Sequence, residues 1–165
     1  MSVKRWKTHL VIAALLIGFV GLAMPPRQRS AAAGDCSPTI VVTGAADSGA
    51  GTLRQALLDI CPQGLITFDF PAPTTILLTS APLVVNVSVT IDAAGAPGVT
   101  LSGGNSRRVL GVSSGVVVGL RGLTIRDGLA GYGGGILNAG ILTLEAVTLT
   151  QNYASHNSPT GLEIS

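Results

Sequence analysis

The chain contains 165 residues, of which 11% are charged and 4% aromatic, and its formal net charge is +2. Half of its ten basic residues lie before residue 34 and all eight acidic residues follow it, so the remainder carries 5 − 8 = −3. This balance argues against a nucleic-acid partner, because binding to phosphates needs a basic surface. Val, Leu, Ile and Thr dominate, which favours β structure with an aliphatic core.

The first segment, residues 1–33, has the pattern of a secretory signal peptide. Three basic residues open the chain, an apolar run from Leu10 to Ala23 follows, and three alanines end the segment at Ala33. The run is too short for a comfortable membrane span, and small residues suit signal peptidase. We therefore predict a secreted or cell-surface protein cleaved after Ala33. An uncleaved anchor, with Arg27 and Arg29 beyond the apolar run, is the alternative.

Two cysteines, Cys36 and Cys61, lie in the remainder of the chain. Exported proteins mature in an oxidising compartment, where an even cysteine count predicts a disulfide. The bond would close the loop between these two positions, and in the chain-entropy model such a closure stabilises the fold. Two free thiols or pairing between chains are the alternatives.

Residues 34–63 are predicted to form an N-terminal cap made of a strand and a helix. The β-branched run within 37–43 favours the strand. Thr52 and Gln55 have the spacing of a reciprocal capping box at the start of a helix over 52–60, and Pro62 is expected to stop it. The apolar residues of this segment share one helical face: Leu53, Ala56, Leu57 and Ile60.

Residues 64–154 are predicted to contain short β-strands with no helix between them, which argues against a βαβ protein. The expected strands are 65–68, 75–79, 83–91, 99–102, 108–112, 116–120, 123–125, 135–138 and 141–150. A sandwich or barrel would also fit short strands.

A loosely repeated phrase favours stacked coils instead. Val89-Thr90-Ile91-Asp92 recurs at 123–127 and at 147–150, so the central aliphatic residue moves from Ile91 to Ile125 and then to Leu149. Such spacings are typical of solenoids, here of about four coils. Aligning the phrases places Asp92 opposite Arg126.

Five segments resemble, in the same order, those of bacterial exported right-handed parallel β-helix proteins. They are VTGAADSGAGTLRQAL (42–57), ITF (66–68), VTIDAAG (89–95), GLTIRDG (122–128) and GGGILNAGILTLEAVTLTQN (133–152). The family is pectin-lyase-like and is related to polymorphic outer-membrane and autotransporter passenger repeats. The resemblance covers about residues 39–154 and implies an all-β, right-handed parallel β-helix with a short N-terminal capping helix.

The resemblance also implies that the chain is a piece of something longer. Members of the family continue with many more GGGI repeats and often a C-terminal anchor, whereas residues 155–165 form a polar tail. The expected partners are therefore further β-helix coils, besides extracellular polysaccharide or a host or cell-surface component. A membrane would be reached only through the signal or a missing C-terminal anchor.

Candidate site residues are few. Enzymes of the resembled superfamily gather acids, often with an arginine, on one outer face of the coil, and the candidates here are Asp92, Arg121, Arg126 and Asp127. Arg107 and Arg108 could bind an acidic sugar or a partner. We interpret all six as ordinary surface charges, although an outer-face cluster of three carboxylates or arginines would favour an enzyme.

No cofactor or metal is predicted, because His156 has no Cys, His or Glu at ligand spacing. The sequence favours a non-enzymatic structural or adhesive surface module, the N-terminal fragment of a longer protein. The alternatives are a polysaccharide-active enzyme, lyase or glycosidase-like, with its site on missing coils, and a nonfunctional truncated product.

Overall fold

The computed structural model describes residues 36–155. The predicted signal peptide (1–33) and all of the polar tail except Ser155 lie outside these residues. One helix and fourteen strands form, in chain order: β1 Ser37–Val42, α1 Leu53–Asp59, β2 Ile60–Phe68, β3 Thr74–Leu77, β4 Leu83–Val85, β5 Val89–Asp92, β6 Val99–Ser102, β7 Leu110–Val112, β8 Val117–Arg121, β9 Leu123–Arg126, β10 Leu129–Ala130, β11 Ile136–Asn138, β12 Ile141–Glu145, β13 Thr148–Thr150 and β14 Tyr153–Ala154.

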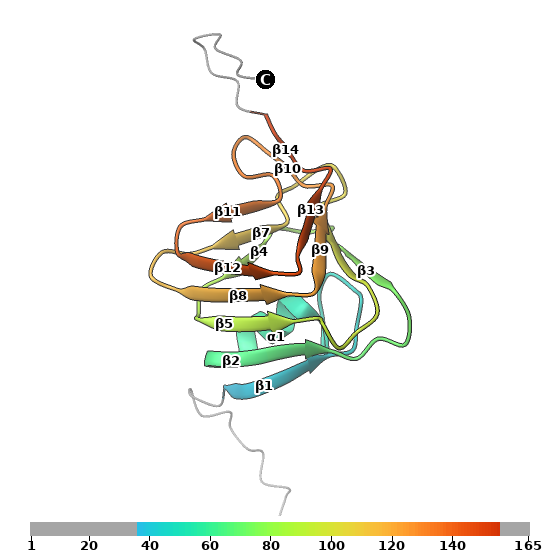
Figure 1. Cartoon of the computed structure of the whole chain (residues 1–165), viewed down its shortest axis with the longest axis vertical. Helices are drawn as coiled ribbons and strands as arrows, with labels where there is room; N and C mark the ends of the chain where they lie inside the picture. The colour runs from blue at the N-terminus through green and yellow to red at the C-terminus, as the bar shows by residue number, and fades with distance from the viewer. Residues whose placement is uncertain (1–35, 156–165) are drawn as a thin grey trace, which may run out of the picture. The chain divides into compact units, whose positions relative to one another are not determined.

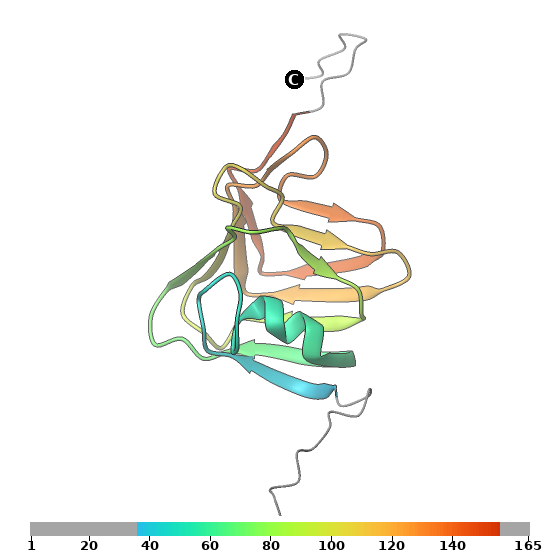
Figure 2. The same cartoon turned by 180° about the vertical axis from the view of Figure 1, so that it is seen from behind.

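The strands stack as the coils of a parallel β-solenoid (Figures 1 and 2). Sheet 1 has the order β1-β2-β5-β8-β12, sheet 2 the order β13-β9-β6-β3 and sheet 3 the order β11-β7-β4. A short β10-β14 pair joins the last two turns, and every pairing is parallel. The predicted β-solenoid is confirmed, with about five turns because β1 adds one below the four expected coils.

The core is a set of aliphatic columns that run along the stack. In sheet 1, Ile66 stands beside Ile91 and Ile91 beside Leu120, and these three side chains are at most 1% exposed. Sheets 2 and 3 repeat this arrangement with Ile76, Leu101 and Ile125, and with Leu83 and Leu110. Alternate residues point outward and are wetter, as a strand with one buried face requires.

The repeated phrase does not mark a single column, so the predicted alignment is wrong. Val89–Asp92 is β5 of sheet 1, whereas Leu123–Arg126 is β9 of sheet 2, and Asp92 stands opposite Arg121 rather than Arg126. The step from Ile125 to Leu149 is correct, because these two residues pair in sheet 2. The longer step, from Ile91 to Ile125, was misleading because strands of two sheets share the same apolar-Thr-apolar pattern.

Two predicted strands are each divided by a corner between sheets. The expected strand over 83–91 is β4 and β5, separated at Asn86, whose side-chain oxygen accepts a hydrogen bond from Ser113 Oγ of the next coil at 2.6 Å. The expected strand over 141–150 is β12 and β13, separated at Ala146 with φ 52°. At the second corner the apolar residues Ala146 and Val147 continue the composition of the strands, so periodicity alone does not reveal it. The first corner is marked by two polar residues, Asn86 and Ser88, which the expected strand passed over.

The N-terminal cap forms around α1. Thr52 accepts from the Gln55 amide at 3.3 Å, as predicted. The reciprocal half of the capping box is wrong, because Gln55 Nε2 reaches forward to both carboxylate oxygens of Asp59, at 3.0 and 2.9 Å. Pro62 lies in β2 rather than stopping the helix, which ends where Ile60 turns to extended backbone.

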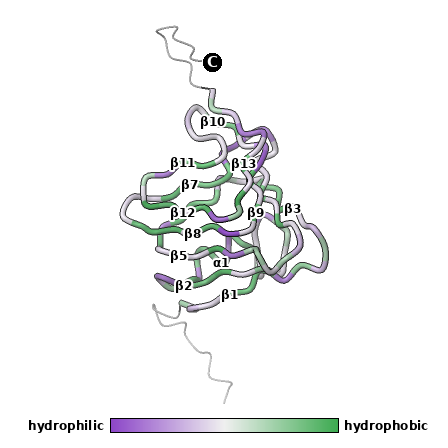
Figure 3. Tube along the Cα trace, in the orientation of Figure 1, coloured by the Kyte–Doolittle hydropathy of each residue, from purple (hydrophilic) through white to green (hydrophobic). Residues whose placement is uncertain are grey.

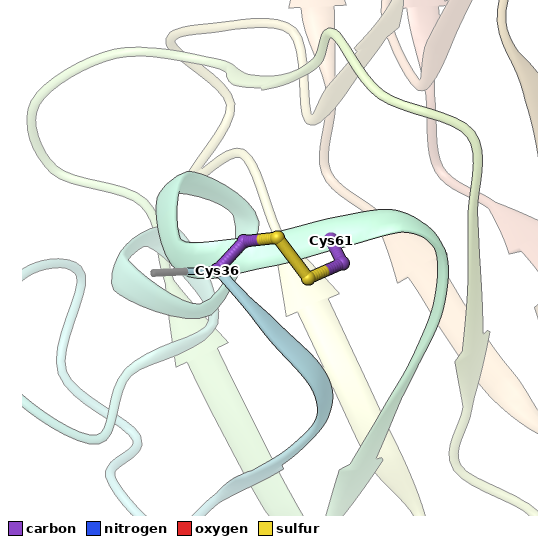
Figure 4. The surroundings of a disulfide bond; sticks show 2 residues. All are labelled: Cys36 and Cys61. Atoms are coloured by element: carbon purple, nitrogen blue, oxygen red, sulfur yellow. A yellow bond between two sulfur atoms is a disulfide. The ribbon is translucent and has the colours of Figure 1, made fainter. Parts of the chain in front are cut away.

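The predicted disulfide joins Cys36, just before β1, to Cys61 in β2 (Figure 4). It ties the first strand of sheet 1 to its neighbour. Helix α1 packs on β1, β2 and β4 and buries Leu53, Ala56 and Leu57. Within residues 36–155 no helix is long and apolar enough to cross a membrane.

Candidate functional site

The outer face of sheet 1 brings together the most concentrated group of charges and a shallow hollow. Outward positions at the ends of β5, β8 and β12 are Asp92, Arg121 and Glu145, one above the other in register. One step back on the same face of these strands stand Thr90, Gly119 and Thr143. The strict parallel register therefore creates a charged row beside a row of hydroxyls interrupted by a glycine.

Arg121 is the centre of the charged row. Its guanidinium donates to Asp92 Oδ2 at 3.4 Å and to Glu145 Oε1 at 3.0 Å. The hydrogen bond to Glu145 and the negative charges of Glu145 and Asp92 raise the pKa of Arg121 above its usual value. Asp92 also accepts from the Ala94 amide at 2.9 Å, which fixes the turn after β5. The row thus links three coils and carries two carboxylates for one guanidinium.

The hollow lies at Gly119, an outward position of β8 that carries no side chain. It has a volume of about 270 Å³ and is lined by Gln63, Ser88, Val89, Thr90, Val117, Val118, Gly119 and Thr143. A Cβ at Gly119 would meet only the Thr90 side chain, at 3.6 Å or more, so the glycine is not required by packing. Hydroxyls and small apolar side chains therefore form a shallow seat next to Arg121.

The structure separates Asp127 and Arg126 from this row. Arg126 ends β9 in sheet 2 and Asp127 follows it, and Asp127 Oδ2 accepts from Arg126 Nε at 2.7 Å and from the hydroxyl of the buried Ser102 at 3.0 Å. The Asp127 carbonyl also accepts from the Asn105 amide at 2.8 Å. Asp127 therefore organises the corner after sheet 2 and belongs to a different sheet from Asp92.

Arg107 and Arg108 bond to backbone carbonyls in the turns of neighbouring coils. Arg108 donates to the carbonyls of Gly133, at 3.0 Å, and Tyr132, at 2.8 Å, and so holds the glycine-rich loop before β11. Arg107 donates to the Ser80 carbonyl, and its buried Nε has no hydrogen-bond partner among the described residues. Both guanidinium groups connect neighbouring coils through these hydrogen bonds.

Two charged residues, Glu145 and Asp47, are not among the site residues predicted from the sequence. Glu145 completes the charged row. The sequence signal that could have found it is its separation from Arg121, which equals the separation of every other paired position of β8 and β12. The Asp47 carboxylate accepts hydrogen bonds from the Arg54 guanidinium at 2.5 Å and from the Ser80 amide at 2.8 Å. Its side chain is 7% exposed. Burial alone would raise the pKa of Asp47, but hydrogen bonds from Arg54, Ser80 and Thr79 lower it far below its usual value.

The Asp47–Arg54 pair joins the cap to the first coil. Arg54 also donates to the carbonyls of Pro82 at 3.0 Å and Ala81 at 2.6 Å, so one guanidinium holds the 79–82 turn against the loop before α1. These contacts occupy the pair fully and give it a structural role. Among residues 36–155 no group of three or more His, Cys, Asp or Glu side chains could hold a metal ion.

Comparison with known proteins identified no relative. No protein-family model, no curated protein and no solved structure matched the chain.

Proposed function

We propose that this chain is a non-enzymatic module of the cell exterior that uses the outer face of sheet 1 to hold extracellular polysaccharide. The observation that carries the proposal is the hollow at Gly119, with hydroxyls of Thr90, Thr143 and Ser88 beside it. Hydroxyl-rich, shallow surfaces suit a sugar chain, which offers many hydroxyls and some apolar ring face. The stacked coils support this binding surface rigidly.

The charged row supports a choice among polysaccharides. Asp92 and Glu145 give two negative charges against the one positive charge of Arg121, and Arg121 already bonds to both carboxylates. The row is therefore net negative, which disfavours polyuronates and favours neutral or amino-sugar polymers. The mature chain's charge of −3, obtained if residues 1–33 are removed, acts in the same direction.

Affinity electrophoresis in gels that contain a neutral β-glucan, chitosan or polygalacturonate tests this function. We expect retardation by the glucan or by chitosan and none by polygalacturonate. Gly119→Leu places a side chain in the hollow, where its Cβ would meet only the Thr90 side chain at 3.6 Å or more, and should abolish retardation. Gly111→Leu is the matched control, because Gly111 is the outward residue of β7 in sheet 3 and a Cβ there would meet only the Leu83 carbonyl, at 3.9 Å. Migration unaffected by all three polymers would refute the proposal, as would an equal effect of the two substitutions.

Export is proposed from the sequence of residues 1–33 and is supported by the disulfide, which is typical of oxidising compartments. N-terminal sequencing of the protein recovered outside expressing cells tests it. The expected first residue is Gly34. An intact N-terminus at Met1 on membrane-bound material would favour the uncleaved anchor.

A polysaccharide-active enzyme is the second candidate, because the structure assembles three charged groups on one outer face. Asp92, Arg121 and Glu145 meet the clustering condition set above. Hydrolysis by paired carboxylates needs one to carry a proton and one to be ionised. Here the Arg121 guanidinium bonds to both carboxylates, so the contacts of the row do not set one carboxylate apart as the acid. The row therefore supports binding better than acid catalysis.

A further inference from the structure

The hollow on sheet 1 has a defined wall on each side of Gly119. Thr90 of β5 and Thr143 of β12 stand beside Gly119 in the register of the sheet, one in the coil before it and one in the coil after it. Adjacent strands of a sheet are about 4.8 Å apart, so the two threonines are separated by roughly 10 Å. The space between them, the Gly119 gap, is therefore one residue wide and is bordered by two hydroxyls.

The polar side chains around the gap have hydrogen-bonding capacity to spare. In the part of the chain that the structure describes, the side chains of Thr90, Thr143 and Gln63 have no hydrogen-bond partner. Ser88 Oγ accepts from the Val117 amide at 3.0 Å, which leaves its O–H free to donate. A hydroxyl can donate one hydrogen bond and accept two. The rim of the hollow thus offers both donors and acceptors to a ligand.

The floor of the gap is apolar. Strand β8 pairs with β5 on one side and with β12 on the other, so the sheet itself uses the backbone N–H and C=O groups of β8. Val89 and Val118 also line the hollow, and both are at most 3% exposed. Figure 3 shows β8 and its neighbour β12 as stacked, largely hydrophobic segments. A group that enters the gap must therefore be apolar at its tip and polar where it meets the rim.

An acetamido group has this combination, because it carries a methyl group beyond one N–H donor and one C=O acceptor. The methyl group can take the place of the missing Gly119 side chain, where a Cβ would lie 3.6 Å from Thr90. The amide then lies between the hydroxyls of the rim. The hydroxyl of a plain glucan would leave the apolar floor uncovered, and the ammonium group of a deacetylated amino sugar would place a charge against it.

We propose that the Gly119 gap binds the acetamido group of an N-acetylated amino-sugar polymer. This inference rests on the proposed polysaccharide function and narrows its ligands, from neutral and amino-sugar polymers to N-acetylated ones. The charged row is compatible with such a ligand, because an acetamido group is neutral and the two carboxylates beside Arg121 do not repel it.

Isothermal titration calorimetry with three β-linked tetramers, of N-acetylglucosamine, of glucosamine and of glucose, tests the inference. We expect the Kd of the N-acetylated tetramer to be at least about tenfold lower than that of either other tetramer, since a site that pairs with a ligand's polar group discriminates against a ligand that lacks it. Added salt should weaken the binding of the charged glucosamine tetramer and leave that of the N-acetylated tetramer unchanged.

Two variants, each with a matched control, locate the contact. Gly119→Ala places a methyl group in the gap and should raise the Kd of the N-acetylated tetramer at least about tenfold. Gly111→Ala makes the same change on the outer face of sheet 3 and should leave it unchanged. Thr143→Val keeps the shape of the side chain and removes a hydroxyl, so it should raise the Kd about threefold or more. Thr148→Val, at an exposed position of β13 in sheet 2, should have no effect.

The outcomes separate this inference from the function on which it rests. Equal Kd values for the N-acetylated and glucose tetramers would overturn the inference and leave the polysaccharide function standing, as would tighter binding of the glucosamine tetramer. Equal effects of Gly119→Ala and Gly111→Ala would also overturn it. No binding of any tetramer, together with no retardation by any polymer, would refute the inference and the function together.

Discussion

Removing the disulfide should lower the melting temperature by an amount that follows from its position. The bond closes a sequence separation of 25 between Cys36 and Cys61. In the chain-entropy model such a closure destabilises the unfolded state by about 3.5 kcal/mol at 25 °C. The part of the chain that the structure describes, 36–155, has an unfolding entropy of roughly 250 cal/mol/K at about 2.1 cal/mol/K per residue. The expected decrease in Tm is therefore about 14 °C.

The assay is thermal unfolding followed by circular dichroism, with and without reductant. The Cys36→Ser/Cys61→Ser double variant should melt about 14 °C below the oxidised parent and should not respond to reductant. The reduced parent should melt close to the double variant. Equal melting temperatures for the oxidised and reduced parent would refute the reasoning, because they would mean that the bond does not restrict the unfolded chain.

Three further expectations concern the cap, the corners and the core. Because its folded-state pKa is depressed below 3.8, Asp47 should contribute stability above about pH 4, and this stability should be lost as the pH falls further. The decrease of Tm with falling pH should therefore be less steep in Asp47→Asn than in the parent. An equal dependence of Tm on pH in the two proteins would contradict this. Gly122 has φ 67°, and a Cβ there would lie 2.7 Å from the Ala94 backbone, so Gly122→Ala should lower the free energy of unfolding in urea by more than about 1 kcal/mol. Ala146 has φ 52°, so Ala146→Gly should raise the free energy of unfolding by roughly 0.5–1 kcal/mol. Effects of the same sign would contradict the corner geometry. Ile91→Ala should cost about 2–5 kcal/mol in the same assay, because Ile91 is 0% exposed between two coils, and a cost below about 1 kcal/mol would contradict the stacked core.

The sequence predicted the parts of the fold that depend on local pattern. Alternating aliphatic residues located nearly every strand, and Thr52 with the apolar face of α1 located the helix. The disulfide followed from an even cysteine count and the expected compartment. The corner at Ala146 did not follow, because it is made by a positive φ at an apolar residue and not by a change of composition. The corner at 86–88 carried a signal in the polar residues Asn86 and Ser88, which the long expected strand ignored.

The candidate site was predicted less well, because its geometry depends on register. A solenoid with two similar phrases in different sheets has more than one plausible alignment, and the one chosen paired Asp92 with Arg126. The true partner, Arg121, is further from Asp92 along the chain than Glu145 is from Arg121. The coil length changes between turns because the corners at 93–98 and 113–116 are longer than their counterparts one coil later, 122 and 139–140. No single period could therefore place all three residues.

The hollow at Gly119 was not predicted, because a missing side chain becomes a site only when its neighbours are known. Thr90 and Thr143 lie a full coil before and after Gly119 in the chain, yet they flank it in the sheet. Sequence alone shows three ordinary positions. The parallel register turns them into one surface.

The central claim is that the charged row of sheet 1 joins coils and borders a binding surface rather than performing chemistry. Incubation with pectate, alginate, glycosaminoglycans and chitosan, followed by assays for new reducing ends and for unsaturated products, tests it most directly. We expect no product above a heat-denatured control from the parent, Asp92→Ala or Asp127→Ala. Turnover by the parent that is lost in Asp92→Ala or Asp127→Ala, but retained in Gly111→Leu, would contradict the account and establish an enzyme.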